Sequence, residues 1–363
     1  MALRTTRGDP GGPARGRGAT SNLEGRYEAV QRQAVDDGWA RDEAELPAIH
    51  TKVTRETAKS IIARNESPDI PFDQSINPYR GCEHGCPYCY ARPTHAYLGL
   101  SPGLDFETRI FAKTNAAELL RKELAAPGYR PSAIALGANT DPYQPVERDL
   151  RITRSILEVL AECEHPFTIV TKNALVERDI DLVAPMAAKR MARAYLSVTN
   201  LDTDLARKLE PRASAPYRRL EAIRRLADAG IPVGVLVAPL IPFVTDRYME
   251  EILARAREAG ATAAGYILLR LPHEVAPLFK EWLATHYPLK ADHVMSLVRQ
   301  MRGGRDYESA FGVRQTGTGT FAELIGKRFD LACHRLGLDR RGRAPLDTSR
   351  FRPPRSGPQL ALF

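Results

Sequence analysis

The sequence predicts an α/β fold, a partial (β/α)6 TIM-like barrel followed by a helical C-terminal extension. Two observations lead to this fold class. Six short apolar segments recur from residue 68 onward, and segments with apolar residues at helical spacing lie between them. Polar residues follow several of the apolar segments directly, and a parallel barrel gathers such residues on one rim.

The six apolar segments are the expected strands. They are residues 73–79, 132–137, 167–170, 194–198, 232–237 and 264–269. The expected helices carry Leu, Ile and Ala about every 3.6 residues. They are residues 116–124, 153–163, 179–186, 217–229 and 246–259. This alternation predicts right-handed crossovers and a parallel sheet, while periodicity alone leaves a doubly wound sheet as the alternative.

The polar residues after the strands are the expected rim of the barrel. They are Asn139, Thr140, Asp141, Thr171, Lys172, Asn173, Ser197, Thr199, Asn200 and Arg270. Each one alone is typical of a helix N-cap or a turn. Their repetition beside a cysteine-rich loop favours a binding site.

The length of 363 residues allows one large domain with extensions. Residues 1–45 mix Gly, Pro, Arg and acidic residues without periodicity, which predicts a disordered basic tail. The barrel is expected over residues 68–288 and the helical extension over 289–338. Residues 339–363 are expected to form a basic linker that ends in a short apolar peptide.

Within the extension, helices are expected at residues 290–301 and 321–336. The second one is preceded by Thr320-x-x-Glu323, a capping-box pattern, and is followed by Gly337.

The net charge of +8 lies almost entirely in the two tails. Residues 1–26 carry five Arg against Asp9 and Glu24, a balance of +3. Residues 339–363 carry six Arg against Asp339 and Asp347, a balance of +4. The charge therefore indicates tails that contact polyanions such as DNA or that keep the protein soluble. It does not indicate which substrate the nearly neutral body between the tails binds.

The sequence has no apolar run of about 18 residues, so no membrane span is expected. The N-terminal residues lack the apolar core of a signal peptide. These features predict a cytoplasmic protein, in which thiols stay reduced.

Three cysteines, Cys82, Cys86 and Cys89, form a Cys-x3-Cys-x2-Cys loop. Gly81 and Gly85 allow the backbone to curl, so the three thiolates can converge on one metal centre. A cubane iron–sulfur cluster would keep one iron open, whereas a zinc site would need a fourth protein donor.

His84 or His95 could supply the fourth zinc ligand, but neither has the usual spacing of a zinc finger, which favours the cluster. The odd number of five cysteines argues against disulfides, and Cys163 and Cys333 are expected to be ordinary buried thiols.

The loop resembles the signature of the radical S-adenosylmethionine (radical SAM) superfamily, in which an aromatic residue, here Tyr88, precedes the third cysteine. Residues 75–82 and 209–214 resemble the branch that contains spore photoproduct lyase and proteins described as DNA repair photolyase-like. The resemblance covers roughly residues 73–270 and implies a partial barrel of the radical SAM type.

The resemblance also implies a reaction. Three cysteines hold a 4Fe–4S cluster whose open iron binds S-adenosylmethionine, and an electron from flavodoxin or ferredoxin cleaves it to a 5′-deoxyadenosyl radical. The branch suggests a lyase that acts in DNA repair on a nucleic-acid component. The alternatives are the same chemistry on RNA, a peptide or a small metabolite, and a zinc-containing nucleic-acid-binding protein without catalysis.

Site residues follow from the same resemblance. Tyr88 is expected beside the adenine, and Lys172 and Ser197 are expected to hold the methionine carboxylate and the ribose. Asn139 and Asp141 stand where many members hold the methionine amino group with a Gly-Gly-Glu pattern, which residues 136–139 do not share. Arg219 resembles a family arginine or caps a helix.

The lyase uses an additional cysteine as hydrogen donor. Neither Cys163 nor Cys333 matches that position, so Tyr143 is the expected hydrogen relay and catalytic residue.

The C-terminal residues Gln359, Leu360, Leu362 and Phe363 resemble the Gln-Leu-x-Leu-Phe peptide by which bacterial repair and replication proteins bind the DNA sliding clamp. The alternative is an apolar tail that packs on its own domain.

Overall fold

A computed structural model describes residues 16–28, 49–339 and 345–354. Its central sheet contains seven strands in the order β10-β9-β8-β7-β6-β3-β2. These strands are β2 (Ile62–Arg64), β3 (Gln74–Ile76), β6 (Ile134–Leu136), β7 (Phe167–Thr171), β8 (Ala192–Ser197), β9 (Val233–Leu240) and β10 (Ala263–Leu268). Six of them match the six apolar segments that the sequence predicts as strands.

The six parallel strands follow one another in chain order, from β3 to β10. A doubly wound sheet reverses its strand order at a switch point, and this sheet has no reversal. The two ends of the sheet, β10 and β2, are not paired with each other in this strand order, and β2 joins β3 antiparallel. The predicted partial (β/α)6 barrel is therefore confirmed, and the doubly wound alternative is wrong.

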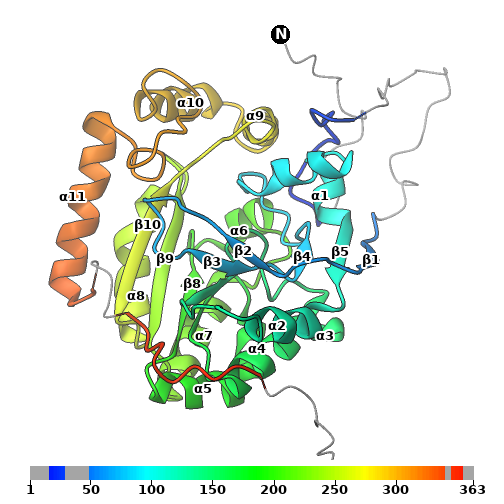
Figure 1. The fold of residues 1–363 in the computed structure, drawn as a ribbon. Coiled ribbons are helices and arrows are strands. Elements are labelled where there is room, and N and C mark those ends of the chain that lie inside the picture. Colours follow the sequence, from blue (N-terminus) through cyan, green and yellow to red (C-terminus); the bar gives the residue numbers. More distant parts are fainter. Residues whose placement is uncertain (1–15, 29–48, 340–344, 355–363) are drawn as a thin grey trace, which may run out of the picture.

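The helices alternate with the strands as expected (Figure 1). They are α1 (Leu104–Thr108), α2 (Ala116–Leu124), α3 (Glu147–Leu150), α4 (Ile152–Glu162), α5 (Ile180–Ala188), α6 (Thr203–Leu209), α7 (Pro216–Asp228), α8 (Met249–Glu258), α9 (Val275–His286), α10 (Ala291–Gln300) and α11 (Gly319–Leu336). Short 3-10 turns lie at Arg92–Thr94, Ala96–Leu98, Ala174–Asp179 and Asp246–Tyr248. Helices α5, α7 and α8 pack against strands β8 and β9.

The strands are buried because helices cover the sheet. Ile76 of β3, Leu136 of β6 and Ile169 of β7 belong to the main apolar cluster, as do Leu196 of β8 and Val235 of β9. Strands that bury apolar side chains in this way are typical of parallel sheets covered by helices.

A second sheet was not predicted. It consists of β1 (Lys52–Glu56), β5 (Arg109–Lys113) and β4 (Tyr79–Arg80), with β1 and β5 parallel. The sequence of β1 is charged and largely exposed, and β4 has only two residues, so neither gives a periodic apolar signal. This small sheet leads directly into the three-cysteine loop.

Both predicted helices of the extension are present as α10 and α11. Helix α11 ends at Gly337, which adopts a left-handed conformation with φ of 63°, as the sequence predicts. The helix begins at Gly319 after Thr318, and Thr318 makes no side-chain cap bond, so the capping box at Thr320 is not the start of the helix. Helix α11 packs against α8, and Arg328 forms an ion pair of 2.8 Å with Glu250.

Part of the N-terminal tail differs from the predicted disorder. Residues 16–28, which we call the N-terminal strap, lie against the body of the protein. Ala19 and Leu23 are buried and form a cluster with Leu278 of α9. In Figure 1 the strap is the dark blue segment beside α1. The Gly-, Pro- and Arg-rich composition of the tail did not reveal these buried contacts. Residues 1–15 and 29–45 of the predicted tail lie outside the described residues.

Part of the C-terminal linker also packs on the body. The Phe351 ring lies 5.2 Å from the His165 ring and 5.5 Å from the Tyr129 ring, measured between centroids. The Arg352 N–H donates a hydrogen bond of 2.9 Å to the Cys163 carbonyl. Within the predicted linker, residues 345–354 therefore pack against the body of the protein. The terminal residues Gln359, Leu360, Leu362 and Phe363 lie outside the described residues.

His165 should make the stability of this region depend on pH. The ring is buried, and burial lowers its pKa from 6.5 to about 4. A folded state that keeps histidine neutral is fully stabilised above pH 6.5 and loses stability as pH falls toward 4. Between pH 7.5 and pH 5 this residue should lower the free energy of unfolding by about 2 kcal/mol. Urea denaturation of the wild type and of His165→Gln should show a smaller loss in the variant, and equal losses would contradict the prediction.

Among the described helices, none is long and apolar enough to cross a membrane.

Candidate active site

The three cysteines lie in a tight loop that follows β4. We call residues 81–90 the cysteine loop. Cys82 and Cys86 are buried and Cys89 is partly buried. Backbone hydrogen bonds run from the Gly85 N–H to the Cys82 carbonyl (3.4 Å) and from the Cys89 N–H to the Cys86 carbonyl (3.2 Å). These successive turns keep the three thiols in one short, compact segment.

Two glycines make this loop possible. Gly81 and Gly85 have φ of 79° and 70°, a region that side chains disfavour. A Cβ at Gly81 would lie 2.9 Å from the Phe106 carbonyl oxygen, and one at Gly85 would lie 2.8 Å from a Glu107 carboxylate oxygen. Both positions therefore require glycine, which confirms the role that the sequence predicts for them.

The thiols stay protonated in the folded protein unless a cation is bound. Burial, followed by the Asp141 carboxylate, raises the pKa of Cys82 well above its usual value. Burial also raises the pKa of Cys86 to about 12. A metal centre deprotonates its thiol ligands and offsets this cost. Three sulfur donors on one loop, two of them buried and one partly buried, therefore fit a thiolate-bound iron–sulfur cluster.

The two histidines proposed as a fourth zinc ligand make other contacts. His84 Nδ1 lies 3.4 Å from an Asp141 oxygen, and its Nε2 lies 3.3 Å from the Asn173 amide nitrogen. His95 Nε2 lies 3.1 Å from the Arg109 carbonyl. In the part of the chain that the structure describes, no three His, Cys, Asp or Glu side chains are arranged to hold one metal ion. Both histidines are therefore engaged with other groups of the protein.

His84 and Asp141 connect the cysteine loop to the ends of the strands. Asp141 accepts hydrogen bonds of 2.7 Å from the Thr171 hydroxyl and from the Lys172 N–H, at the end of β7. A neutral His84 can donate from Nδ1 to Asp141 and accept from Asn173 at Nε2. Burial lowers the pKa of His84, which favours this neutral form. Asp141 therefore positions the loop, and its oxygens are occupied by groups of the protein itself.

Tyr88 is held by a buried ion pair that the sequence did not reveal. Its hydroxyl donates to Glu210, and Arg219 donates to the other Glu210 oxygen at 2.5 Å. Burial opposes ionisation of Glu210, but the charges of Arg219 and Lys172 outweigh burial and hold its pKa below the usual value. Glu210 lies within residues 209–214, the segment that resembles the spore photoproduct lyase branch. This resemblance was the one signal in the sequence that could have marked Glu210 as a site residue.

Arg219 uses its remaining donors on the backbone. It donates to the Ser197 carbonyl at 2.9 Å and to the Ser214 carbonyl at 2.7 Å. Ser197 is buried at the end of β8. Arg219 therefore links β8, residues 209–214 and Tyr88, which makes it a positioning residue and not merely a helix cap.

Lys172 and Asn139 lie on the same rim. The Lys172 ammonium is 6.0 Å from the centre of the Tyr88 ring. The Asn139 N–H donates to the Asn77 side chain at 2.9 Å. Lys172 and Asp141 therefore meet at the end of β7, Ser197 lies at the end of β8, and Arg219 reaches Ser197 from α7.

Tyr143 does not join this group. Its side chain is 0% exposed, it belongs to the main core cluster, and its ring lies 5.9 Å from the Arg178 guanidinium. Burial and the nearby Asp179 charge raise its pKa well above the usual value. A phenol enclosed in this way cannot meet a substrate, so the predicted hydrogen relay does not fit the structure.

The N-terminal strap holds the cysteine loop from outside. Arg92 donates to the Cys86 carbonyl at 2.8 Å and forms a buried ion pair with Glu107. Glu107 also accepts hydrogen bonds from the backbone N–H groups of Gly18 (3.0 Å) and Ala19 (2.8 Å). The strap and the loop are therefore joined through one carboxylate.

The strap continues from the cysteine loop to α9. The Ser21 hydroxyl donates to Glu281 at 2.6 Å, and Arg26 pairs with Glu274 at 2.6 Å. The strap therefore connects the first part of the barrel with the helix that follows β10.

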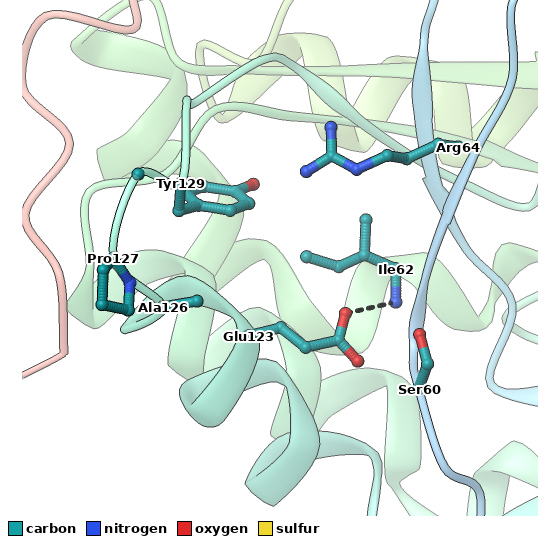
Figure 2. A pocket seen from close by; sticks show the side chains of 8 residues that line it. Ser60, Ile62, Arg64, Glu123, Ala126, Pro127 and Tyr129 are labelled. Carbon is teal, nitrogen blue, oxygen red and sulfur yellow. Dashed lines mark hydrogen bonds between the residues drawn. The ribbon is translucent and has the colours of Figure 1, made fainter.

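A pocket of about 370 Å³ lies away from this site, between β2 and the end of α2 (Figure 2). Glu123 in this pocket accepts hydrogen bonds from the backbone N–H groups of Ile61 (2.7 Å) and Ile62 (3.0 Å). No residue of the cysteine loop lines it. A second pocket of about 170 Å³ is lined by Glu210, Ser214 and Tyr217 and adjoins the Tyr88 contacts. The chemistry-bearing residues are thus at the rim and not in the larger pocket.

Comparison with known proteins agrees with this geometry. Residues 76–256 match the sequence profile of the radical SAM superfamily, and this range contains the cysteine loop, Glu210 and Arg219. The chain is 37% identical over 243 residues to the uncharacterized protein Rv2578c of Mycobacterium tuberculosis, which covers 66% of this chain and 72% of that protein. It is 27% identical over 213 residues to an uncharacterized protein of Methanocaldococcus jannaschii, covering 59% of this chain and 76% of that one.

Among solved structures, the fold is similar to that of spore photoproduct lyase. One variant of that enzyme has a TM-score of 0.56 at 17% identity, covering 79% of this chain and 80% of the other. Its complex with a dinucleoside spore photoproduct has a TM-score of 0.55 at 18% identity, with the same coverage. At this identity the likeness establishes the fold alone. The sequence profile shows that the chain belongs to the radical SAM superfamily, whose members are enzymes that use a 4Fe–4S cluster and S-adenosylmethionine.

Proposed function

We propose that this enzyme acts on a component of nucleic acid, as a lyase-like enzyme of DNA repair. The observation that carries the proposal is the buried three-cysteine loop on a fold similar to that of spore photoproduct lyase, whose complex contains a dinucleoside photoproduct. The bound cofactors supply a 5′-deoxyadenosyl radical that removes a hydrogen atom from the substrate.

The residues around the loop divide into two groups. Cys82, Cys86 and Cys89 hold the cluster, and Lys172 offers a cation for the methionine carboxylate. We assign the ribose of S-adenosylmethionine to Ser197, and its methionine amino group to the half-buried part of the rim around Asn139.

The second group positions the first. Glu210 fixes the Tyr88 hydroxyl and so the position of the ring, which we assign beside the adenine. Asp141 and Arg219 hold the strand ends in place, since their polar atoms already bind protein groups. This division replaces the direct cofactor contacts that the sequence resemblance implied for Asp141 and Arg219.

The superfamily's chemistry requires a reductant, for which we propose flavodoxin or ferredoxin. Binding of the sliding clamp through Gln359, Leu360, Leu362 and Phe363 stays a prediction from the sequence.

Deuterium transfer tests the proposed substrate class. The enzyme is purified without oxygen, reduced with dithionite and incubated with S-adenosylmethionine and deuterated DNA that has been irradiated with ultraviolet light. We expect deuterium in 5′-deoxyadenosine, measured by mass spectrometry, because the radical removes hydrogen from the substrate.

Unirradiated DNA, deuterated RNA and a deuterated peptide mixture serve as parallel samples. Transfer from RNA or peptide alone would replace DNA by one of those substrate classes. A colourless protein with one zinc and no acid-labile sulfide would contradict the ligand assignment itself.

A further inference from the structure

Two cations lie beside the third cysteine. Lys172 lies 6.0 Å from the Tyr88 ring, and the Arg270 guanidinium carbon lies 5.4 Å from the centre of the Tyr90 ring. Tyr88 and Tyr90 are the immediate neighbours of Cys89 in the chain. Lys172 follows β7 and Arg270 follows β10, so both cations project from the rim where the cysteine loop lies.

Arg270 differs from the buried arginines of the site because most of its hydrogen-bond donors are not used. Its contact with the Tyr307 hydroxyl is 3.4 Å long, and its buried Nε has no hydrogen-bond partner. No described Asp or Glu forms an ion pair with it. Arg92 and Arg219, in contrast, each pair with a buried carboxylate. Arg270 is therefore a cation at the strand ends that no carboxylate of residues 16–28, 49–339 or 345–354 pairs with.

A second arginine adds to the positive charge here. Arg302 donates to the carbonyls of Leu268 (3.2 Å) and Leu269 (2.8 Å), at the end of β10. Burial, followed by the charge of Arg270, lowers the pKa of Arg302 to about 10. An anion bound at Arg270 would offset the part of this shift that comes from the charge of Arg270.

The Tyr90 ring, over which the Arg270 guanidinium lies, is both held in place and accessible. Its hydroxyl donates to the Ala138 carbonyl, yet 45% of the residue stays exposed. An exposed aromatic ring beside an arginine is the combination that binds single nucleic-acid strands, with the base on the ring and the phosphate on the cation.

We propose that Arg270 binds a phosphodiester of the substrate strand next to Tyr90. The inference rests on the proposed function, in which Lys172 is assigned to the methionine carboxylate. S-adenosylmethionine has only that one carboxylate. The second cation is then left for the substrate. A planar guanidinium with free donors suits the two unesterified oxygens of a phosphodiester.

A pair of matched dinucleotides tests this contact. The probes are thymidylyl-thymidine and its methylphosphonate analogue, which keeps both bases and removes the charge. Their affinities for the cluster-loaded protein with S-adenosylmethionine are measured without oxygen by calorimetry. The wild type should bind the phosphodiester roughly tenfold more tightly, a preference of about 1.4 kcal/mol.

The variant Arg270→Gln should lose this preference and keep its affinity for the methylphosphonate. Arg255→Gln is the control, since Arg255 lies on α8 and pairs with Glu251 at 2.6 Å. It removes the same charge and should keep the preference.

Three outcomes would overturn the inference. They are an unchanged preference in Arg270→Gln, an equal loss of affinity for both probes, and no binding of either probe by the wild type at millimolar concentration. Iron content, measured on each preparation, separates these outcomes from failure of the proposed function. A wild-type protein without iron contradicts that function, whereas an iron-loaded protein without the preference contradicts only the role of Arg270.

Discussion

Replacing Cys86 by alanine should remove bound iron and lower cleavage of S-adenosylmethionine by more than about a hundredfold. Changes in residues that merely support a metal ligand already cost about 10- to 100-fold, and Cys86 is assigned as a ligand itself. The loop should keep its fold, because the hydrogen bonds that hold it at residue 86 are made by the backbone and not by the Cys86 side chain. The Cys86 carbonyl accepts from Arg92, and the Cys89 N–H donates to that carbonyl as well.

Cys163→Ala is the matched control. Cys163 is also buried, but it follows α4 and its carbonyl accepts from Arg352. This variant should retain iron and acid-labile sulfide at wild-type levels. Full iron content in Cys86→Ala, or loss of iron in Cys163→Ala alone, would mean that the cluster is held by a different set of cysteines.

The strand pattern and the cysteine loop could be predicted because both are local signals. Most barrel strands are short segments rich in apolar residues, as in Phe167, Ile169 and Val170 of β7, and such segments indicate a buried parallel strand. The three cysteines likewise stand within eight residues, with glycines where the backbone turns. Fold class and the proposed ligand set could therefore be inferred before any contact was known.

The supports of the site could not be predicted, because they join distant parts of the chain. Tyr88 and Glu210 are 122 residues apart, and Gly18 and Glu107 are 89 apart. Nothing local distinguishes these charged residues from surface ones. Tyr143 shows the opposite error, a residue that the sequence places in the site and the structure places in the core. It follows β6 in the place of a rim residue, but its ring turns into the core beside Arg178.

Glu107→Ala should destabilise the fold and the cysteine loop together. The Glu107 and Arg92 side chains are both 0% exposed, and removal of one partner leaves the other charge buried and unpaired. Loss of one member of such a pair costs about 3–5 kcal/mol. The backbone N–H groups of Gly18 and Ala19 would also lose their acceptor. We expect a lower thermal midpoint and reduced iron retention, measured by calorimetry and iron assay.

Gly18→Ala tests the same junction without altering charge. A Cβ at Gly18 would lie 1.7 Å from the Gly85 carbonyl oxygen, which is a backbone atom of the cysteine loop. The strap must therefore move away, and iron retention should fall as it does in Glu107→Ala. Gly99→Ala is a suitable control, since nothing lies within 4 Å of the added carbon although Gly99 has a positive φ of 65°. This control adds backbone strain at Gly99 but no collision, so a loss of iron specific to Gly18→Ala reports the collision with the cysteine loop. If Gly18→Ala and Gly99→Ala retain iron equally, contact between the strap and the loop does not stabilise the cluster site.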